Sequence, residues 1–164
     1  MTITLRPATE ADIPFVMATE RMPGYERTVG RWEAAAHQAE IANPASAYFI
    51  GEREDVPAGF VMVLSLDEPA GNVLLKRIAV AAPDRGIGRA LLTQVIDWVF
   101  ARPQSHRFWL TVAPHNERAR HLYRSLGFQE EGMLREAHIN PQGERISSVL
   151  MSLLRPEWEA QRRA

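Results

Sequence analysis

The chain has 164 residues, with 19 basic and 20 acidic side chains and a formal net charge of −1, and this length is typical of one domain. So balanced a charge provides no field that would gather nucleic acid or an anionic membrane, and we expect neither as a partner. Cysteine is absent, which excludes disulfides, thiolate nucleophiles and Cys-ligated zinc.

No apolar run reaches the ~18 residues that span a bilayer, and an N-terminus in which Thr2, Thr4 and Arg6 interrupt the apolar residues does not fit a signal peptide. We therefore expect a cytoplasmic protein in which residues 1–164 form a single domain.

The first half of the sequence combines two amphipathic segments with several short β-rich runs. Thr9, with Asp12 three residues later, predicts a helix start, and Asn43-Pro44 ends a second helix. The β-rich runs are separated by turn residues, which is typical of an antiparallel meander. The predicted elements are a strand at 3–6, helices at 9–20 and 31–42, and strands at 47–52, 58–66 and 73–80.

The segment from Pro83 to Leu92 joins the last of these strands to a predicted helix at 88–100 through two glycines. Gly86 and Gly88 allow positive φ and the close approach of a ligand. Free N–H groups at a helix start attract an anion, and Arg85 and Arg89 add charge. The segment predicts a phosphate-binding turn. In the alternative interpretation, the glycines only relieve strain in a tight turn.

The identity of the phosphate ligand is narrowed by what the turn lacks. The third glycine of a dinucleotide fingerprint is replaced by Leu91, which would obstruct packing of the helix on the strand. No Gly-Lys pair followed by a hydroxyl occurs, so a P-loop is also excluded.

A second block follows a predicted strand at 107–112. Asn116 is a good helix N-cap and Gly127 a good helix stop. Apolar residues between them recur at i, i+3, i+4 and i+7, so Tyr123 lies on the inward face. A terminal strand pair is predicted around the turn at 140–143. Together the elements predict an α/β fold: a mixed, mostly antiparallel central sheet with helices on both faces.

The glycine turn and the block from Asn116 to Phe128 together resemble the GNAT superfamily of acyl-CoA-dependent N-acetyltransferases, and the resemblance covers most of the chain. In that family the pattern [QR]-x-x-G-x-[GA] binds the cofactor pyrophosphate. Gly86 and Gly88 match its glycines, whereas Pro83 stands where Gln or Arg is usual. Residues 128–136, 149–154 and 157–158 are loosely similar to the branch of ribosomal-protein N-terminal and polyamine acetyltransferases.

The resemblance implies a GNAT-like fold that uses acetyl-CoA as co-substrate and no metal. It implies transfer of an acetyl group to a primary amine of a small molecule or a protein N-terminus, by direct attack in a ternary complex. It also allows a homodimer. An alternative of a different class is a non-catalytic module on the same fold, which binds acyl-CoA as a sensor or uses its sheet edge for a partner.

The resemblance also implies a set of site residues. Tyr123 matches the position whose hydroxyl gives a proton to the leaving thiolate, although a core tyrosine bonded to a backbone carbonyl is the alternative. Asn116 matches the asparagine that contacts the cofactor arm, and its alternative role is the N-cap alone. The other cofactor-binding residues lie at the end of the strand before the glycine turn, whose unpaired backbone groups bind the pantetheine arm, and in the turn itself: Ile78, Ala79, Val80, Arg85, Gly86, Ile87, Gly88, Arg89 and Ala90.

The group that deprotonates the amine is left open. An alkyl amine with a pKa near 10.4 is neutral in only about one molecule in 10³ at pH 7. Some N-terminal acetyltransferases have a Glu twelve residues before the tyrosine, but Thr111 stands there, and a hydroxyl is no base at neutral pH. A water chain to bulk solvent is one alternative, and His37 and His106 are expected to be solvated. The candidate bases are His115, His138 and Glu26.

Overall fold

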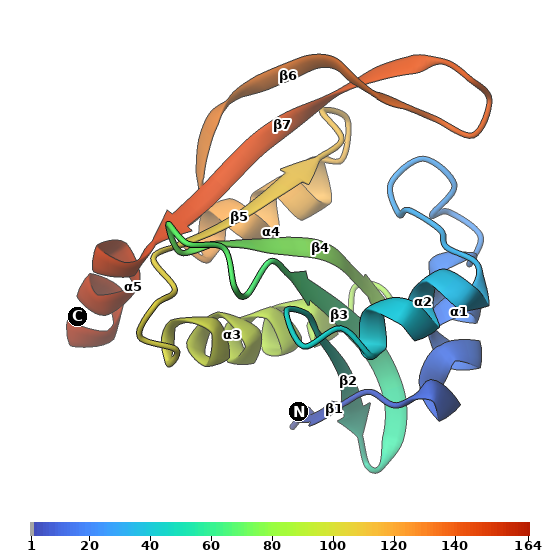
Figure 1. Ribbon diagram of the computed structural model, residues 1–164, viewed down its shortest axis with the longest axis horizontal. Coiled ribbons are helices and arrows are strands. Elements are labelled where there is room, and N and C mark those ends of the chain that lie inside the picture. Colours follow the sequence, from blue (N-terminus) through green and yellow to red (C-terminus); the bar gives the residue numbers. More distant parts are fainter. Residues whose placement is uncertain (1) are drawn as a thin grey trace.

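The computed structural model describes residues 2–164, in which seven strands form one sheet of order β1-β2-β3-β4-β5-β7-β6 (Figure 1). All neighbouring strands are antiparallel except β4 and β5, which are parallel. The predicted mixed, mostly antiparallel sheet is confirmed. The strands are β1 (Thr4–Pro7), β2 (Ala47–Arg53), β3 (Val56–Leu64), β4 (Asn72–Val80), β5 (Arg107–Val112), β6 (Gln129–Ile139) and β7 (Arg145–Leu154).

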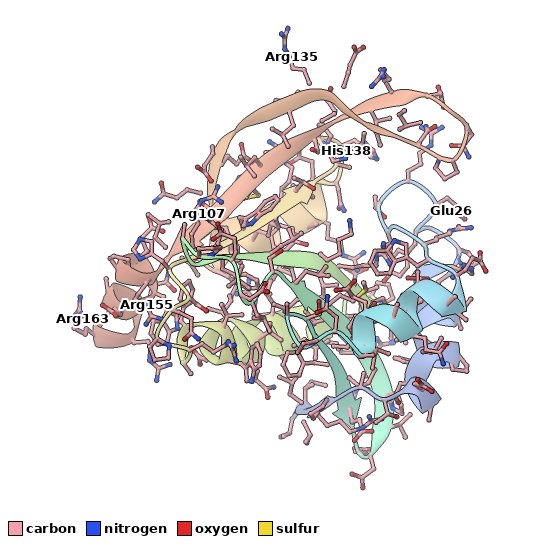
Figure 2. All side chains as sticks on the ribbon, in the orientation of Figure 1. Glu26, Arg107, Arg135, His138, Arg155 and Arg163 are labelled. Carbon is pink, nitrogen blue, oxygen red and sulfur yellow. The ribbon has the colours of Figure 1, made fainter. Side chains whose placement is uncertain are left out.

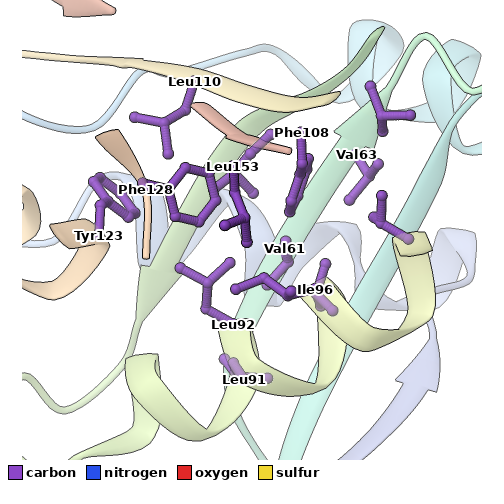
Figure 3. Packing of buried hydrophobic residues seen from close by; sticks show 14 of the residues in the cluster. Val61, Val63, Leu91, Leu92, Ile96, Phe108, Leu110, Tyr123, Phe128 and Leu153 are labelled. Atoms are coloured by element: carbon purple, nitrogen blue, oxygen red, sulfur yellow. The ribbon is translucent and has the colours of Figure 1, made fainter. Parts of the chain in front are cut away.

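Helices cover both faces of this sheet, as predicted. The helical elements are the 3-10 helix η1 (Glu10–Asp12), α1 (Ile13–Glu20), α2 (Ala34–Ile41), α3 (Ile87–Phe100), α4 (Glu117–Ser125) and α5 (Arg155–Arg163). On one face, α3 buries Leu92 against Val61 and Phe108, and Tyr123 of α4 joins the same core (Figure 3). Complete burial of a leucine side chain such as Leu92 contributes about 2 kcal/mol. On the other face, Val16 of α1 belongs to a second, smaller core.

Element boundaries in the first half differ from the prediction where distant contacts intervene. The strand predicted from residue 58 begins at Val56, because Glu54 and Asp55 have φ values of 53° and 62° and form a tight hairpin turn. The helix predicted from residue 31 begins at Ala34. Its start is delayed because the Trp32 N–H donates to the Glu20 carboxylate at 3.0 Å.

The helix α5 is an element that the sequence analysis did not predict. Pro156 stands in its first turn, where the missing N–H costs no hydrogen bond. The carboxylate of Glu157 accepts the Leu154 N–H at 2.8 Å and caps the helix. Trp158 then packs on the α3 side of the core. Among residues 2–164, no helix combines the length and the apolar character needed to cross a bilayer.

The pairing of β3 with β4 contains one extra residue on the β4 side. Met62 pairs with Arg77, and the next residue, Val63, pairs with Leu75, so Lys76 has no partner. Such a β-bulge bends the strand and disturbs the alternation of its side chains. Leu75 belongs to the α3-side core, whereas Arg77 lies against the Met62 sulfur on the α1 side.

Candidate active site

A cleft opens where β4 and β5 separate. The two strands pair over three positions only, from Asn72–Arg107 to Leu74–Trp109. Beyond them lies a cleft of about 680 Å³, lined by residues 75–80 of β4 and 110–113 of β5 and the turn after it. This volume lies within the range of small-molecule sites, about 300–1,000 Å³. The remaining walls come from residues 24–25 and 28–30 after α1, and from the starts of α3 and α4.

The open edge of β4 presents the backbone groups of Ile78 and Val80. The Ala81 N–H donates to the Ala58 carbonyl at 2.8 Å, so this pair is hydrogen-bonded. In an antiparallel ladder hydrogen-bonded pairs alternate with open ones, and the register therefore directs the N–H and C=O of Val80 and Ile78 away from β3. The same alternation turns the backbone of Ala79 toward β3. The predicted backbone edge thus narrows to Ile78 and Val80, and Ala79 only lines the cleft.

The start of α3 presents backbone N–H groups to the cleft. Gly86 is the N-cap with φ 73°, which confirms the predicted left-handed turn. The Ala90 N–H donates to the Gly86 carbonyl at 3.1 Å, so the N–H groups of Ile87, Gly88 and Arg89 precede the first intrahelical bond. Within residues 2–164 these three groups have no backbone acceptor, and their residues line the cleft. They fit a pyrophosphate group.

Gly88 lies inside α3, so the positive φ expected for it is wrong. A Cβ at Gly88 would lie 3.7 Å from the Leu122 side chain and 3.9 Å from that of Val80, both of which line the cleft. The role of Gly88 is therefore to leave this surface of the helix clear for a ligand.

The predicted cofactor set is not brought together in full. Arg89 lines the cleft and donates to the Ser125 Oγ at 2.5 Å. Arg85 is exposed and does not line the cleft. Ala90 differs from the prediction, because its N–H is engaged within the helix and its side chain packs on the core.

Tyr123 lines the cleft from α4 and is 8% exposed. Its ring packs against Phe128, with 5.8 Å between the centroids (Figure 3). Burial raises the pKa of its hydroxyl to about 12, so the hydroxyl keeps its proton at neutral pH. Within residues 2–164 this hydroxyl has no hydrogen-bond partner, and burial alone accounts for its pKa. This disfavours the alternative of a core tyrosine bonded to a carbonyl.

Residues at the start of α4 line the cleft, and one of them contacts the glycine turn. Asn116 accepts the Ala119 N–H at 3.2 Å, which confirms the N-cap, and it also lines the cleft. Arg118, two residues further on, forms an exposed ion pair with Asp84 at 3.3 Å. Arg118 was not predicted as a site residue, although three arginines within seven residues of the α4 sequence were a visible signal.

The candidate bases are divided by their position. Thr111 and His115 line the cleft, whereas His138 and Glu26 do not. Figure 2 labels His138 on the β6–β7 hairpin, where its Nε2 lies 2.8 Å from the Ser148 Oγ, and Glu26 on the segment after α1, where it accepts the Gly24 N–H at 2.9 Å. Among residues 2–164, no group of three or more metal-ligating side chains occurs.

A buried ionic cluster lies behind the segment that follows α1. The fully buried carboxylate of Glu20 accepts from Arg77 at 2.9 Å and from Arg21 at 2.7 Å, and the Nε2 of His37 lies 2.9 Å away. The expectation that His37 is solvated is wrong, because a buried carboxylate needs such partners. This cluster was not predicted from the sequence. Its signal was the pair Lys76-Arg77 inside an apolar strand.

The segment after α1 reaches the open edge of β4. The hydroxyl of Tyr25 donates to the Val80 carbonyl at 2.7 Å, and burial raises the pKa of that hydroxyl. Thr28, Val29 and Gly30 line the same cleft. This segment therefore forms one wall of the cleft.

A cleft between splayed parallel strands, with an anion-binding helix start at one end, is the geometry that the resemblance led us to expect of an acyl-CoA-dependent transferase. Residues 16–128 match the model of the Acetyltransferase (GNAT) family, and the chain belongs to this family.

Two relatives illustrate its range. The chain is similar to the N-alpha-acetyltransferase RimI of Mycobacterium tuberculosis, with 35% identity over 107 residues, which cover 63% of this chain and 65% of that protein. It is also similar to the spermidine N(1)-acetyltransferase of Vibrio cholerae, with 38% identity over 60 residues, 35% of each chain. The matches span less than two thirds of the length of these curated relatives.

The likeness to solved structures extends over nearly the whole chain. A spermidine N-acetyltransferase from Vibrio cholerae, in complex with CoA and spermine, has a TM-score of 0.83 at 23% identity, covering 96% of this chain and 98% of that chain. At this level of identity the likeness shows the GNAT fold.

Proposed function

We propose that the protein transfers an acetyl group from acetyl-CoA to a primary amine of a small molecule or a protein N-terminus. The observation that carries this proposal is that one cleft holds the free N–H groups at the start of α3, the open edge of β4 and the hydroxyl of Tyr123. Each of these groups suits a different part of the same long molecule.

The residues of the cleft fit acetyl-CoA from end to end. The pyrophosphate fits the N–H groups of Ile87, Gly88 and Arg89. The amide-rich arm fits the backbone groups of Ile78 and the N–H of Val80, whose carbonyl accepts from Tyr25, because both partners are peptide-like and pair as strands do. Acetyl-CoA supplies the activated acetyl group when bound.

Tyr123 provides the proton donor in this proposal. Its hydroxyl is protonated at neutral pH because its pKa is raised to about 12. Within residues 2–164 the hydroxyl donates no hydrogen bond to another protein group, so it is free to donate to a ligand. We assign it the role of donating to the sulfur as the thiolate leaves. General-acid assistance of this kind contributes roughly 10²–10⁴ in rate.

The acceptor amine reaches the acetyl group from the face of the sheet that carries residues 24–30 in this proposal. Some relatives have a carboxylate at the position of Thr111, so in this protein no carboxylate is present there to act as the base. Of the candidate bases, His115 is the one supported by its place in the cleft lining. A water chain through the open cleft is the other route for the proton.

Several features remain predictions. One sheet holds strands from residue 4 to residue 154, which supports a single acetyltransferase domain over residues 1–164. Acetyl-CoA is an intracellular metabolite, which supports a cytoplasmic location. The homodimer stays a prediction.

The test combines cofactor binding with turnover. Acetyl-CoA at 100 times its dissociation constant should stabilise the fold by about 2.7 kcal/mol, measured as a rise in melting temperature. Free thiol should then appear only when an amine is present. Stabilisation without thiol release for any amine in a broad panel would favour the sensor alternative. A melting temperature that does not respond to acetyl-CoA would contradict both functions.

A further inference from the structure

Arg77, the residue after the bulge in β4, has a guanidinium group fixed on two sides. Its side chain is 7% exposed, and its Nη1 donates to the Glu20 carboxylate at 2.9 Å. The ring of Trp32 lies over the guanidinium, with 5.2 Å between the Cζ atom and the ring centroid. Glu20 is itself held by the Trp32 N–H and by Arg21. The position and orientation of the guanidinium are therefore set by the protein before any ligand binds.

The other edge of this guanidinium, formed by Nε and Nη2, has no hydrogen-bond partner among residues 2–164. Arg77 lines the cleft, and neither atom belongs to the fully buried unsatisfied groups, so the edge opens to the cleft. Gly30 lies beside it: a Cβ there would be 2.5 Å from Nη2 and 3.2 Å from Nε. A side chain at position 30 would therefore press against this edge of the guanidinium. Unpaired donors on a largely buried side chain are costly, and a ligand oxygen would remove that cost.

The edge lies at the acceptor end of the cleft. Arg77 is on the α1 side of the sheet, with residues 24–30, whereas Tyr123 and the N–H groups of α3 are on the α3 side. Lys76, which also lines the cleft, adds a second basic side chain at this end.

Behind the cleft, the charge of Arg77 is offset by Glu20, which also pairs with Arg21. Within the described part of the chain, the acidic residues that line the cleft are Asp84 and Glu117. Both lie at the cofactor end, where they pair with Arg118 at 3.3 Å and Arg120 at 2.9 Å. The described lining of the acceptor end therefore has basic side chains and no acidic one, which disfavours a polycationic amine.

We propose that Arg77 binds a carboxylate of the acceptor, so that the substrate is an amine that also carries a carboxylate group. This inference rests on the proposed acetyltransferase function. The Nε and Nη2 edge of a guanidinium can donate two parallel hydrogen bonds to the two oxygens of one carboxylate. Two sources share this chemistry: a free amino acid, and a peptide whose first residue is acidic.

The first test uses the unaltered protein and matched amines. Values of kcat/KM are measured by thiol release at saturating acetyl-CoA for phenylalanine against phenethylamine, for arginine against agmatine, and for a peptide beginning with Asp against one beginning with Asn. We expect at least a tenfold preference for the carboxylate member, in the free amino acids or in the peptides, and the arm that shows it identifies the source.

The possible failures are distinguishable. Equal or reversed ratios in all three pairs would overturn the assignment to Arg77 while leaving acetyl transfer intact. If no amine is acetylated, the proposed function fails, and the inference falls with it.

The second test blocks the edge without removing the arginine. Gly30→Ala places a Cβ against Nη2 and Nε, so the preference ratio should fall at least fivefold, while the KM for acetyl-CoA stays within twofold. Arg27→Gln, an exposed residue of the same segment that does not line the cleft, is the matched control and should keep the ratio. Both kcat/KM values of a pair are measured on the same protein sample. A lower concentration of folded protein would therefore reduce both values equally and leave their ratio unchanged. A Gly30→Ala protein that retains the full preference would refute the proposal.

Discussion

Replacing Tyr123 with phenylalanine separates the chemistry of its hydroxyl from the packing of its ring. The ring is buried against Phe128 in the α3-side core, and phenylalanine preserves that contact. Because the hydroxyl has no partner among residues 2–164, its removal leaves no other group unsatisfied. We therefore expect the free energy of unfolding to change by less than about 1 kcal/mol.

The effect on rate follows from the raised pKa. A tyrosine with a pKa of about 12 is a weaker acid than a thiol with a pKa of about 8.5, so full proton transfer to a free thiolate is uphill by about 5 kcal/mol. The hydroxyl should therefore act as a hydrogen-bond donor while negative charge develops on sulfur. This places the loss of kcat near the lower end of the usual range, about 10²-fold, equivalent to about 2.7 kcal/mol.

The assay is steady-state thiol release with a good amine, together with a melting curve for each protein. The KM for acetyl-CoA should change by less than about threefold, because an interaction made only in the transition state affects kcat and not ground-state binding. A folded Tyr123→Phe protein with unchanged kcat would refute the donor role, provided that single-turnover measurements show that chemistry limits the rate.

Three further predictions concern the phosphate site, the base and a stabilising ion pair. Gly88→Asp should abolish most of the rise in melting temperature caused by acetyl-CoA, because a carboxylate would face the pyrophosphate; an unchanged rise would contradict the assignment of this helix start. His115→Ala should remove an acidic limb from the pH profile of kcat/KM if His115 deprotonates the amine, and an unaltered profile would favour the water chain. Hydrogen bonds from Arg6 lower the pKa of Asp12, so the folded state favours the ionised form, and this stabilisation is present above the unfolded pKa of about 3.9 and is lost as pH falls through the lowered value. Asp12→Asn should therefore reduce the melting temperature at pH 7, and the difference from the unaltered protein should shrink below pH 4; a difference that does not depend on pH would show that the ion pair contributes nothing.

Features encoded by neighbouring residues could be predicted from the sequence. Gly86 at the start of α3 and Asn116 at the start of α4 have local causes, a left-handed turn and a side-chain cap, and both are found. The sheet and its helical layers also follow from the order and period of the apolar residues. The phosphate end of the cleft could be located in this way.

The acceptor end of the cleft could not be located from the sequence, because its groups meet only through long-range contacts. Arg77 depends on Glu20, 57 residues earlier in the chain, and His37 is buried for the same reason. The bulge that gives Arg77 its position arises from the pairing of β3 with β4 and has no turn signal of its own. The helix α5 was missed because its apolar contact is a single residue, Trp158.

The unpaired Lys76 has a consequence for how this protein can change over generations. Because it shifts the strand by one position, Leu75 and Ile78 serve the same core, while Arg77 between them faces the opposite layer. If a residue were inserted or deleted between Leu75 and the glycine turn, the side chains of this part of β4 would move to the opposite face of the sheet. This stretch of β4 can therefore vary in its side chains but not in its length, and new acceptor preferences would arise there by substitution alone.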